Sequence, residues 1–226
     1  MAAGSVRREI AVLRAAFAWA VRERWIGWAP YVEMPPAPPP RDRWLSRADV
    51  DSLIHGAGSP HVRLFVVLAY HTAARTGAIL DLTWDRVDLD QRLINYDRPD
   101  RARSRKRRAV VPINSVALAE LQAARMIAVS DHVIEFRGKP VAAVRTGFAH
   151  ASRRAGVRCT PHVLRHTAAT HMLMARVPMI DIARMLGDSV AMVDEVYGKH
   201  NPDFLRSAAE ALAGETGPRG KETQRK

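Results

Sequence analysis

Three residues in the C-terminal half of the chain have the side chains and spacing needed for chemistry on a phosphodiester. His162 and Arg165 lie three positions apart in a segment with helical periodicity, so both side chains project from one helix face. Tyr197 lies further along the chain, at a predicted helix end. A guanidinium binds two phosphate oxygens at once, an imidazole moves a proton near neutral pH, and a tyrosine oxygen can attack phosphorus. If the three side chains meet in the fold, they could open a phosphodiester without a metal ion.

Three short helices are predicted to position these groups. The first spans about 160–175, because its Thr-Pro start supplies a cap and a favourable first helical residue. The second spans about 177–187, with Gly187 as the expected left-handed stop. The third begins at Asp188 or Ser189, either of which can cap it, and carries the tyrosine in its last turn, where a side chain can move. The apolar positions of the second helix are Ile180, Ile182, Met185 and Leu186.

A second arginine follows a predicted helix earlier in the chain. Residues 61–72 form a strongly apolar segment that indicates a buried helix. Arg75 follows this segment directly, so we expect its side chain to be held rigidly.

The order and spacing of these segments resemble the tyrosine recombinase (phage integrase) family. The matching segments are His162-Val-Leu-Arg165-His166, Leu186-Gly187 and Tyr197, preceded by Thr72-Ala-Ala-Arg75 and Leu80-Asp-Leu-Thr-Trp84-Asp85. The resemblance spans about residues 43–213 and implies an α+β fold, mainly α-helical, with a small antiparallel β-sheet. It also implies a set of catalytic positions, which are Arg75, Lys106, His162, Arg165, Asp188 and Tyr197.

The resemblance implies site-specific DNA recombination or integration by strand cleavage and rejoining. Tyr197 would become linked to a DNA 3′ phosphate, and a 5′ hydroxyl would reverse that step. No cofactor is expected, because the covalent bond conserves the energy of the original one. The expected partners are double-stranded DNA and further copies of the chain, forming a tetramer on DNA. Accessory DNA-bending proteins are left open.

Two rival functions fit parts of the sequence. A truncated, catalytically impaired relative could bind DNA in a regulatory role or have no role. A metal enzyme could instead use His162, His166 and His171 as ligands. His171 lies nine residues past His162, roughly 180° around a helix, and is expected to point elsewhere.

The sequence departs from the family pattern at three positions. Ala78 replaces a usual Glu, Ala73 a usual Gly, and Asp188 a usual His or Trp. The resemblance places Asp188 beside the scissile phosphate. A carboxylate ~4 Å from a phosphate oxygen would be repelled by about 4 kcal/mol at an effective dielectric of 20. Asp188 could avoid this repulsion by pairing with a cation such as Arg165 or Lys199, by protonation, or by capping the following helix. The cap is favoured, because Asp188 directly follows Gly187.

A strongly cationic segment is predicted to contact DNA. Residues 98–108 connect two predicted strands, at 87–96 and 108–113, of a small antiparallel sheet. Such a run is often a solvated face or a nonspecific phosphate contact. In the family this hairpin carries a catalytic Lys, a role that falls to Lys106, with Arg103 or Arg105 as alternatives. The expected DNA-binding residues are Arg101, Arg103, Arg105, Arg107 and Arg108.

Composition supports a nucleic-acid partner and a cytoplasmic location. The 226 residues include 35 Lys and Arg against 23 Asp and Glu, a net charge of +12 that favours a polyanionic partner. One cysteine, Cys159, excludes an internal disulfide framework. No apolar run approaches the ~20 residues of a membrane span, and the N-terminus lacks the apolar segment of a signal peptide.

The chain is predicted to contain one full domain flanked by shorter segments. Residues 1–33 are read as a remnant of an N-terminal DNA core-binding domain, although their helix, at about 6–26, could instead dock on this chain's own core. A Pro-rich linker at 34–42 follows. The catalytic domain at 43–213 ends in a helix at 201–212, and residues 214–226 are predicted to be a disordered tail.

Overall fold

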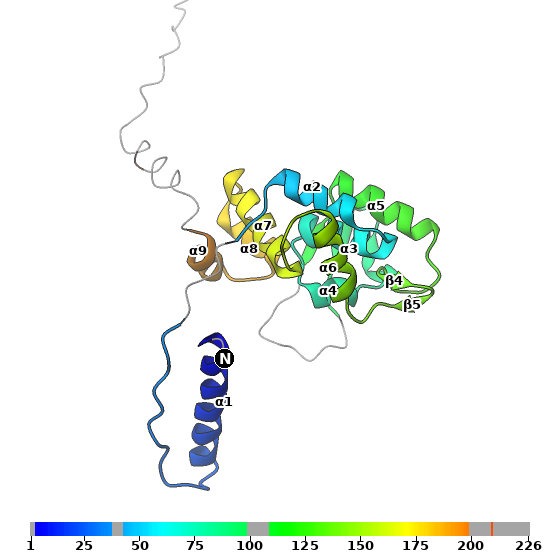
Figure 1. Ribbon diagram of the computed structural model, residues 1–226. Coiled ribbons are helices and arrows are strands. Elements are labelled where there is room, and N and C mark those ends of the chain that lie inside the picture. The colour runs from blue at the N-terminus through cyan, green and yellow to red at the C-terminus, as the bar shows by residue number, and fades with distance from the viewer. Residues whose placement is uncertain (1–2, 38–42, 99–108, 199–208, 210–226) are drawn as a thin grey trace, which may run out of the picture. The chain divides into compact units, whose positions relative to one another are not determined.

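The computed structural model describes residues 3–37, 43–98, 109–198 and 209 of the 226 in the chain. The chain divides into two compact units, Met1–Asp42 and Arg43–Lys226 (Figure 1). The predicted tail and, apart from Ala209, the predicted last helix lie outside the described residues. Within the described ranges, no helix is both long and apolar enough to cross a membrane.

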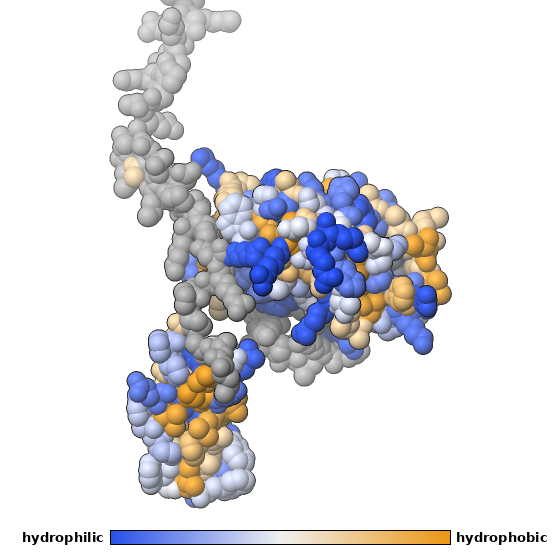
Figure 2. Space-filling model, in the orientation of Figure 1, coloured by the Kyte–Doolittle hydropathy of each residue, from blue (hydrophilic) through white to orange (hydrophobic). Residues whose placement is uncertain are grey.

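The first unit is built on helix α1 (Ala3–Arg22). The helix ends before the predicted Ile26, because Arg24 adopts a left-handed backbone (φ 61°) and the N–H of Trp25 turns back to the carbonyl of Ala20. Trp25 packs edge-on against Trp19, with ring centroids 4.6 Å apart. Hydrophobic side chains follow the visible face of α1 (Figure 2) and are largely exposed.

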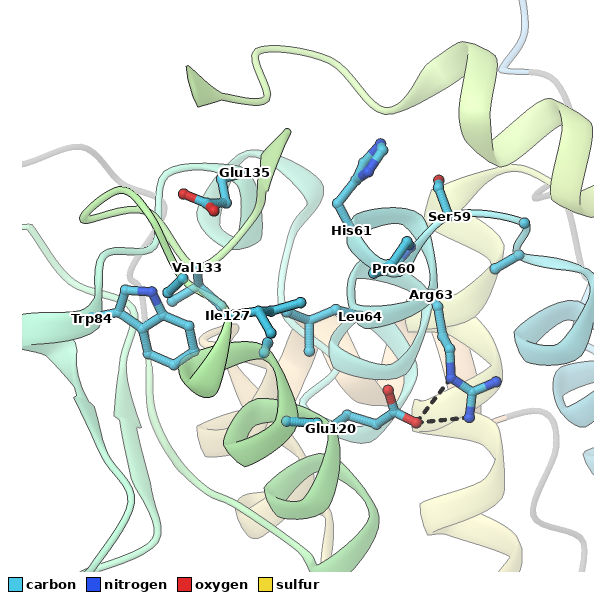
Figure 3. A pocket seen from close by; sticks show the side chains of 15 residues that line it. Ser59, Pro60, His61, Arg63, Leu64, Trp84, Glu120, Ile127, Val133 and Glu135 are labelled. Atoms are coloured by element: carbon cyan, nitrogen blue, oxygen red, sulfur yellow. Dashed lines mark hydrogen bonds and ion pairs between the residues drawn. The ribbon is translucent and has the colours of Figure 1, made fainter. Parts of the chain in front are cut away.

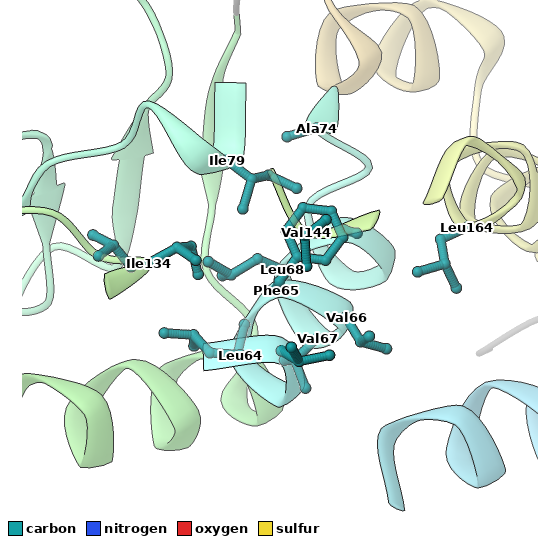
Figure 4. Close-up of a cluster of buried hydrophobic side chains, with 14 of the residues drawn as sticks. Leu64, Phe65, Val66, Val67, Leu68, Ala74, Ile79, Ile134, Val144 and Leu164 are labelled. Carbon is teal, nitrogen blue, oxygen red and sulfur yellow. The ribbon is translucent and has the colours of Figure 1, made fainter. Parts of the chain in front are cut away.

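The second unit is organised around a helix that is buried along most of its length, α3 (Pro60–His71). Helices α2 (Arg47–Gly56), α5 (Ser115–Met126), α6 (Arg145–Arg154) and α7 (Pro161–Met174) pack against it. Figure 4 shows its apolar side chains at the centre of the core; the fully buried ones are Phe65, Val66, Val67 and Leu68. Burial on all sides explains why the middle of the helix, from Leu64 to Ala69, is entirely apolar.

Two small antiparallel sheets lie beside these helices. After the short 3-10 helix η1 (Trp84–Arg86), the first sheet has the order β1 (Val87–Asp88), β2 (Leu93–Asn95) and β3 (Val110–Pro112). Ile94 in the central strand pairs with Val87 on one side and Val111 on the other. A second sheet joins β4 (Glu135–Phe136) to β5 (Lys139–Pro140). The expected mainly helical fold with a small antiparallel sheet is therefore confirmed.

Three short helices complete the described part of the second unit. These are α4 (Thr76–Leu80), α8 (Met179–Leu186) and α9 (Val190–Tyr197). Gly187 ends α8 with a left-handed backbone (φ 63°), as predicted. Two details of the prediction are wrong: Thr160 makes no side-chain cap bond at the start of α7, and Ile180 is exposed rather than inward-facing. Residues from α7, α8 and α9 share a second core cluster with Ala73.

Candidate active site

The side chain of Arg165 connects three separate segments of the second unit. It projects from α7 and is only 6% exposed. Its Nη1 donates to the carbonyl oxygen of Ala73 at 2.7 Å, and its Nη2 donates to that of Leu186 at 2.8 Å. Burial lowers the pKa of Arg165, and the positive charge of Arg75 lowers it further. The guanidinium therefore fixes both the turn before Arg75 and the end of α8.

Arg75 is positioned by a tight turn between α3 and α4. Thr72 closes α3, and Ala73 then adopts a left-handed backbone (φ 52°), which disfavours a side chain and favours glycine. This geometry gives a physical reason for the glycine that the family usually has there. The turn directs the Ala73 carbonyl to Arg165 and places Arg75 at the start of α4. The two predicted arginines are thus linked through the backbone.

Asp188 pairs with both arginines and does not cap α9. One carboxylate oxygen accepts a hydrogen bond from Arg75 Nη2, and the other accepts one from Arg165 Nη2 at 2.5 Å. The cap is Ser189, whose side chain accepts from the N–H of Met192 at 3.2 Å. The favoured reading of Asp188 as a helix cap was therefore wrong, and its pairing with Arg165 is the alternative that the structure supports. Two buried or half-buried guanidinium groups attract the carboxylate more strongly than free backbone N–H groups do.

Tyr197 is the last residue of α9, and its hydroxyl faces a histidine. The residue is 7% exposed, so its side chain is not the mobile one that a helix end suggested. Its Oη lies 2.8 Å from Nδ1 of His166 on α7. Burial raises the pKa of Tyr197 to about 12, although the charge of Arg165 opposes that rise. The phenol therefore keeps its proton at neutral pH.

His162 lies one helical turn before His166 and packs against it. The two rings are nearly perpendicular, with centroids 4.4 Å apart. Partial burial lowers the pKa of His162, and the charges of Arg165 and Arg75 lower it further. His162 is therefore uncharged at neutral pH. His171, the third histidine of the metal hypothesis, instead lies 2.8 Å from the hydroxyl of Tyr70, as expected from its position on another helix face.

The described part of the predicted site thus comes together from five segments of the chain. The turn at Ala73, α4, α7, the end of α8 and α9 all contribute to it. Lys106 and the expected DNA-binding residues lie outside the described residues; the latter are Arg101, Arg103, Arg105, Arg107 and Arg108. Sequence reasoning considered His166 only as a ligand of the rival metal site and gave it no part in phosphodiester chemistry, whereas the structure places it against the hydroxyl of Tyr197. Its position four residues after His162, on the same helix face, was the available signal.

A separate apolar cavity of about 380 Å³ lies between the start of α3 and α5 (Figure 3). Leu64, Ile127 and Val133 line it, and the rim is polar. There Arg63 donates through Nε and Nη2 to one carboxylate oxygen of Glu120, at 2.9 and 2.7 Å. None of the predicted site residues that the structure describes lines this cavity. The predicted site residues that the structure describes therefore lie in the arginine, histidine and tyrosine cluster and not at this cavity.

Comparison with known proteins agrees with this geometry. A sequence model of the phage integrase family matches residues 43–203. The chain belongs to the phage integrase family. Among curated members, tyrosine recombinase XerA of Thermococcus kodakarensis is 33% identical over 159 residues, which cover 66% of this chain and 54% of the relative. Tyrosine recombinase XerC of Xylella fastidiosa is 25% identical over 227 residues, covering 93% of this chain and 75% of the relative. The chain thus spans about half the length of the XerA relative.

Solved structures of family members share the fold. The crystal structure of XerA recombinase is 25% identical, with a TM-score of 0.61, and the match covers 80% of this chain and 68% of that one. The Tn1549 transposon integrase, solved with a circular intermediate DNA, is 16% identical with a TM-score of 0.77 and coverage of 94% and 80%. The helical arrangement is therefore that of phage integrase catalytic domains.

Proposed function

We propose that this chain carries the catalytic domain of a site-specific tyrosine recombinase, which cuts and rejoins double-stranded DNA through a 3′-phosphotyrosine. One observation carries the proposal: Tyr197 presents its hydroxyl to a histidine in the cluster that also contains Arg165. We assign residues 43–213 to the catalytic domain, 34–42 to a linker and 1–33 to part of a DNA core-binding domain. The XerA and XerC relatives, named as tyrosine recombinases, support this assignment.

In the proposed reaction, Arg75 and Arg165 bind the non-bridging oxygens of the scissile phosphate. The Tyr197 oxygen attacks phosphorus and loses its proton, while the bond to the 5′ oxygen breaks and that oxygen gains a proton. Two guanidiniums stabilise the charge that develops on the phosphate oxygens. Lys106 is proposed as the acid for the leaving oxygen, and His162 as a group that moves a proton near the phosphate. A DNA 5′ hydroxyl reverses the same steps when the strands are joined.

Asp188 gives this site a property of its own. Its carboxylate accepts hydrogen bonds from both of the guanidiniums that the proposed mechanism uses to bind the phosphate. A DNA phosphate must therefore displace the Asp188 carboxylate, or share the two arginines with it, before the arginines can stabilise a transition state. The contacts of Asp188 hold the two arginine side chains in place without DNA, but they lower the affinity of these arginines for phosphate. The catalytically impaired alternative is not favoured, since the described nucleophile and both arginines are retained together.

The proposed partners are DNA and further copies of the chain. Lambda integrase, a neighbour in fold with a TM-score of 0.65, was solved as a tetramer bound to a Holliday junction. We extend that mode of assembly to this chain, with the hairpin arginines as phosphate contacts; these are Arg101, Arg103, Arg105, Arg107 and Arg108. Each contact would release a counterion and steepen the salt dependence of binding.

Covalent capture on DNA tests the proposed function. The chain is mixed with a pool of nicked 40-base-pair duplexes of random sequence, and protein that stays attached to DNA after denaturation is isolated and its DNA sequenced. The proposal predicts an adduct that forms without metal or ATP and enriches one sequence. Tyr197→Phe should bind the enriched duplex but form no adduct. A DNA-bound wild-type chain that never becomes covalently attached would contradict the proposal.

A further inference from the structure

The hydroxyl of Tyr197 makes its hydrogen bond with one identified group, the Nδ1 atom of His166. The distance is 2.8 Å, within the range over which a proton passes directly between two atoms. The ring planes are tilted by 53°, with centroids 5.5 Å apart, so the contact is edge-on through the nitrogen rather than a stacking of faces. His162 is the histidine that the sequence analysis expected to move protons. Among the described residues, no hydrogen bond joins it to the tyrosine, and it lies one helical turn before His166 on α7.

The buried tyrosine needs a neighbouring group that can accept its proton. Tyr197 is buried, and burial holds its proton in place with a pKa of about 12. A phenol in that state is a weak nucleophile unless a neighbouring group accepts its proton during attack.

We propose that His166 is a catalytic residue, the general base that accepts the proton of Tyr197 as its oxygen attacks the scissile phosphate. This inference rests on the proposed function. As the bond between Oη and phosphorus forms, the proton passes to Nδ1 of His166, which becomes an imidazolium. The phosphorus bond to the 5′ oxygen breaks, and Lys106 or water protonates that oxygen. On rejoining, a 5′ hydroxyl attacks the phosphotyrosine and gives its proton back to the group that had supplied it, while His166 returns its proton to the departing phenolate.

The surroundings of His166 suit this exchange. His162 packs against His166 from the same helix. Because the pKa of His162 is lowered, its ring is uncharged at neutral pH, and the imidazolium that forms at His166 does not face a second positive charge there. Arg165 follows His162 on α7, and Asp188 at the α8–α9 junction neutralises part of its charge. Among the residues that the structure describes, these groups and Tyr197 are titratable side chains that act near the pair from α7, α9 and the end of α8.

The tautomer of His166 provides a test that needs no DNA. A base must present an unprotonated Nδ1 to the tyrosine, with the ring proton on Nε2. Nitrogen-15 NMR of histidine-labelled protein, assigned with His166→Asn, should show this tautomer at pH 7.5, and Tyr197→Phe should shift the Nδ1 resonance. A protonated Nδ1 that donates to the tyrosine oxygen would overturn the inference.

Kinetics on DNA separate proton transfer from positioning. His166→Asn places an amide near the Nδ1 position, so it can hold the hydroxyl but cannot accept a proton. With the captured nicked duplex, we expect adduct formation at pH 7 to slow by about 100-fold or more. The deficit should shrink as pH rises toward 10, because the ionised fraction of the phenol, although small, increases about tenfold with each pH unit below its pKa of about 12. His150→Asn, on an exposed residue of α6, should leave both rate and pH profile unchanged.

The outcomes distinguish the two proposals. An unimpaired His166→Asn variant, or a deficit that is constant from pH 6 to pH 10, would overturn the role of His166 while wild-type adduct formation still supports the recombinase. Absence of any wild-type adduct would overturn both.

Discussion

Asp188 places a carboxylate oxygen 2.5 Å from Nη2 of Arg165, a side chain that is only 6% exposed. The other carboxylate oxygen reaches Arg75, so one acidic side chain links the two arginines that the proposed mechanism uses to bind phosphate. A buried guanidinium without a counter-charge is costly, and this contact removes much of that cost. The site therefore keeps its shape in the absence of DNA.

Replacing Asp188 with Asn should strengthen anion binding and weaken the fold. The change removes the negative charge that competes with phosphate, so we expect the affinity for inorganic phosphate or vanadate to rise by about tenfold, ~1.4 kcal/mol. Arg165 also loses its counter-charge, which should lower the free energy of unfolding by about 1–3 kcal/mol. Calorimetric titration and urea unfolding measure the two effects.

Asp181→Asn is the matched control for this change. Asp181 contacts Arg184 on the exposed surface of α8, and surface pairs of this kind contribute little. Equal phosphate affinity in wild type and Asp188→Asn would show that the two arginines do not form an anion site.

The start of α9 should depend on Ser189. Its side chain accepts a hydrogen bond from the Met192 N–H, so Ser189→Ala should lower the free energy of unfolding by about 1 kcal/mol. Ser59 occupies the same position before α3 but makes no side-chain cap bond, so Ser59→Ala should have a much smaller effect. Similar losses in the two variants would argue against a cap at Ser189.

Stability should fall as the pH drops below 6.5. Burial lowers the folded-state pKa of four histidines, which are His61, His71, His162 and His171. Between the lowered values and 6.5 the unfolded chain binds more protons, so the free energy of unfolding decreases with decreasing pH and is highest above 6.5. Urea unfolding at pH 7.5 and pH 5.5 should reveal this decrease, and His171→Gln should reduce it. A higher stability at pH 5.5 would mean that these rings gain cation-stabilising contacts on folding.

Much of the fold could be predicted from local patterns in the sequence. The left-handed stop at Gly187 and the apolar α3 segment depend on residues close together in the chain, and both are present. Helix ends were less accurate, since the end of α1 depends on a backbone conformation at Arg24 that arginine rarely adopts.

The arrangement of the site was harder to predict because it depends on contacts between distant segments. Arg165 and Ala73 are 92 positions apart, and nothing local to either indicates their hydrogen bond. Asp188 follows a helix stop, where capping is the local preference, yet the two arginines supply a stronger attraction from elsewhere in the fold. The role inferred for His166 likewise depends on the packing of α9 against α7, which brings Tyr197 to it.

The proposed reaction is tested most directly by identifying the residue that becomes covalently linked to DNA. The chain contains four tyrosines, at positions 31, 70, 96 and 197, so digestion of the covalent adduct with nuclease and protease gives a clear assignment by mass spectrometry. We predict that the remaining nucleotide is attached through a 3′ phosphate to the peptide that contains Tyr197. Attachment to any other residue, or through a 5′ phosphate, would contradict the proposed chemistry.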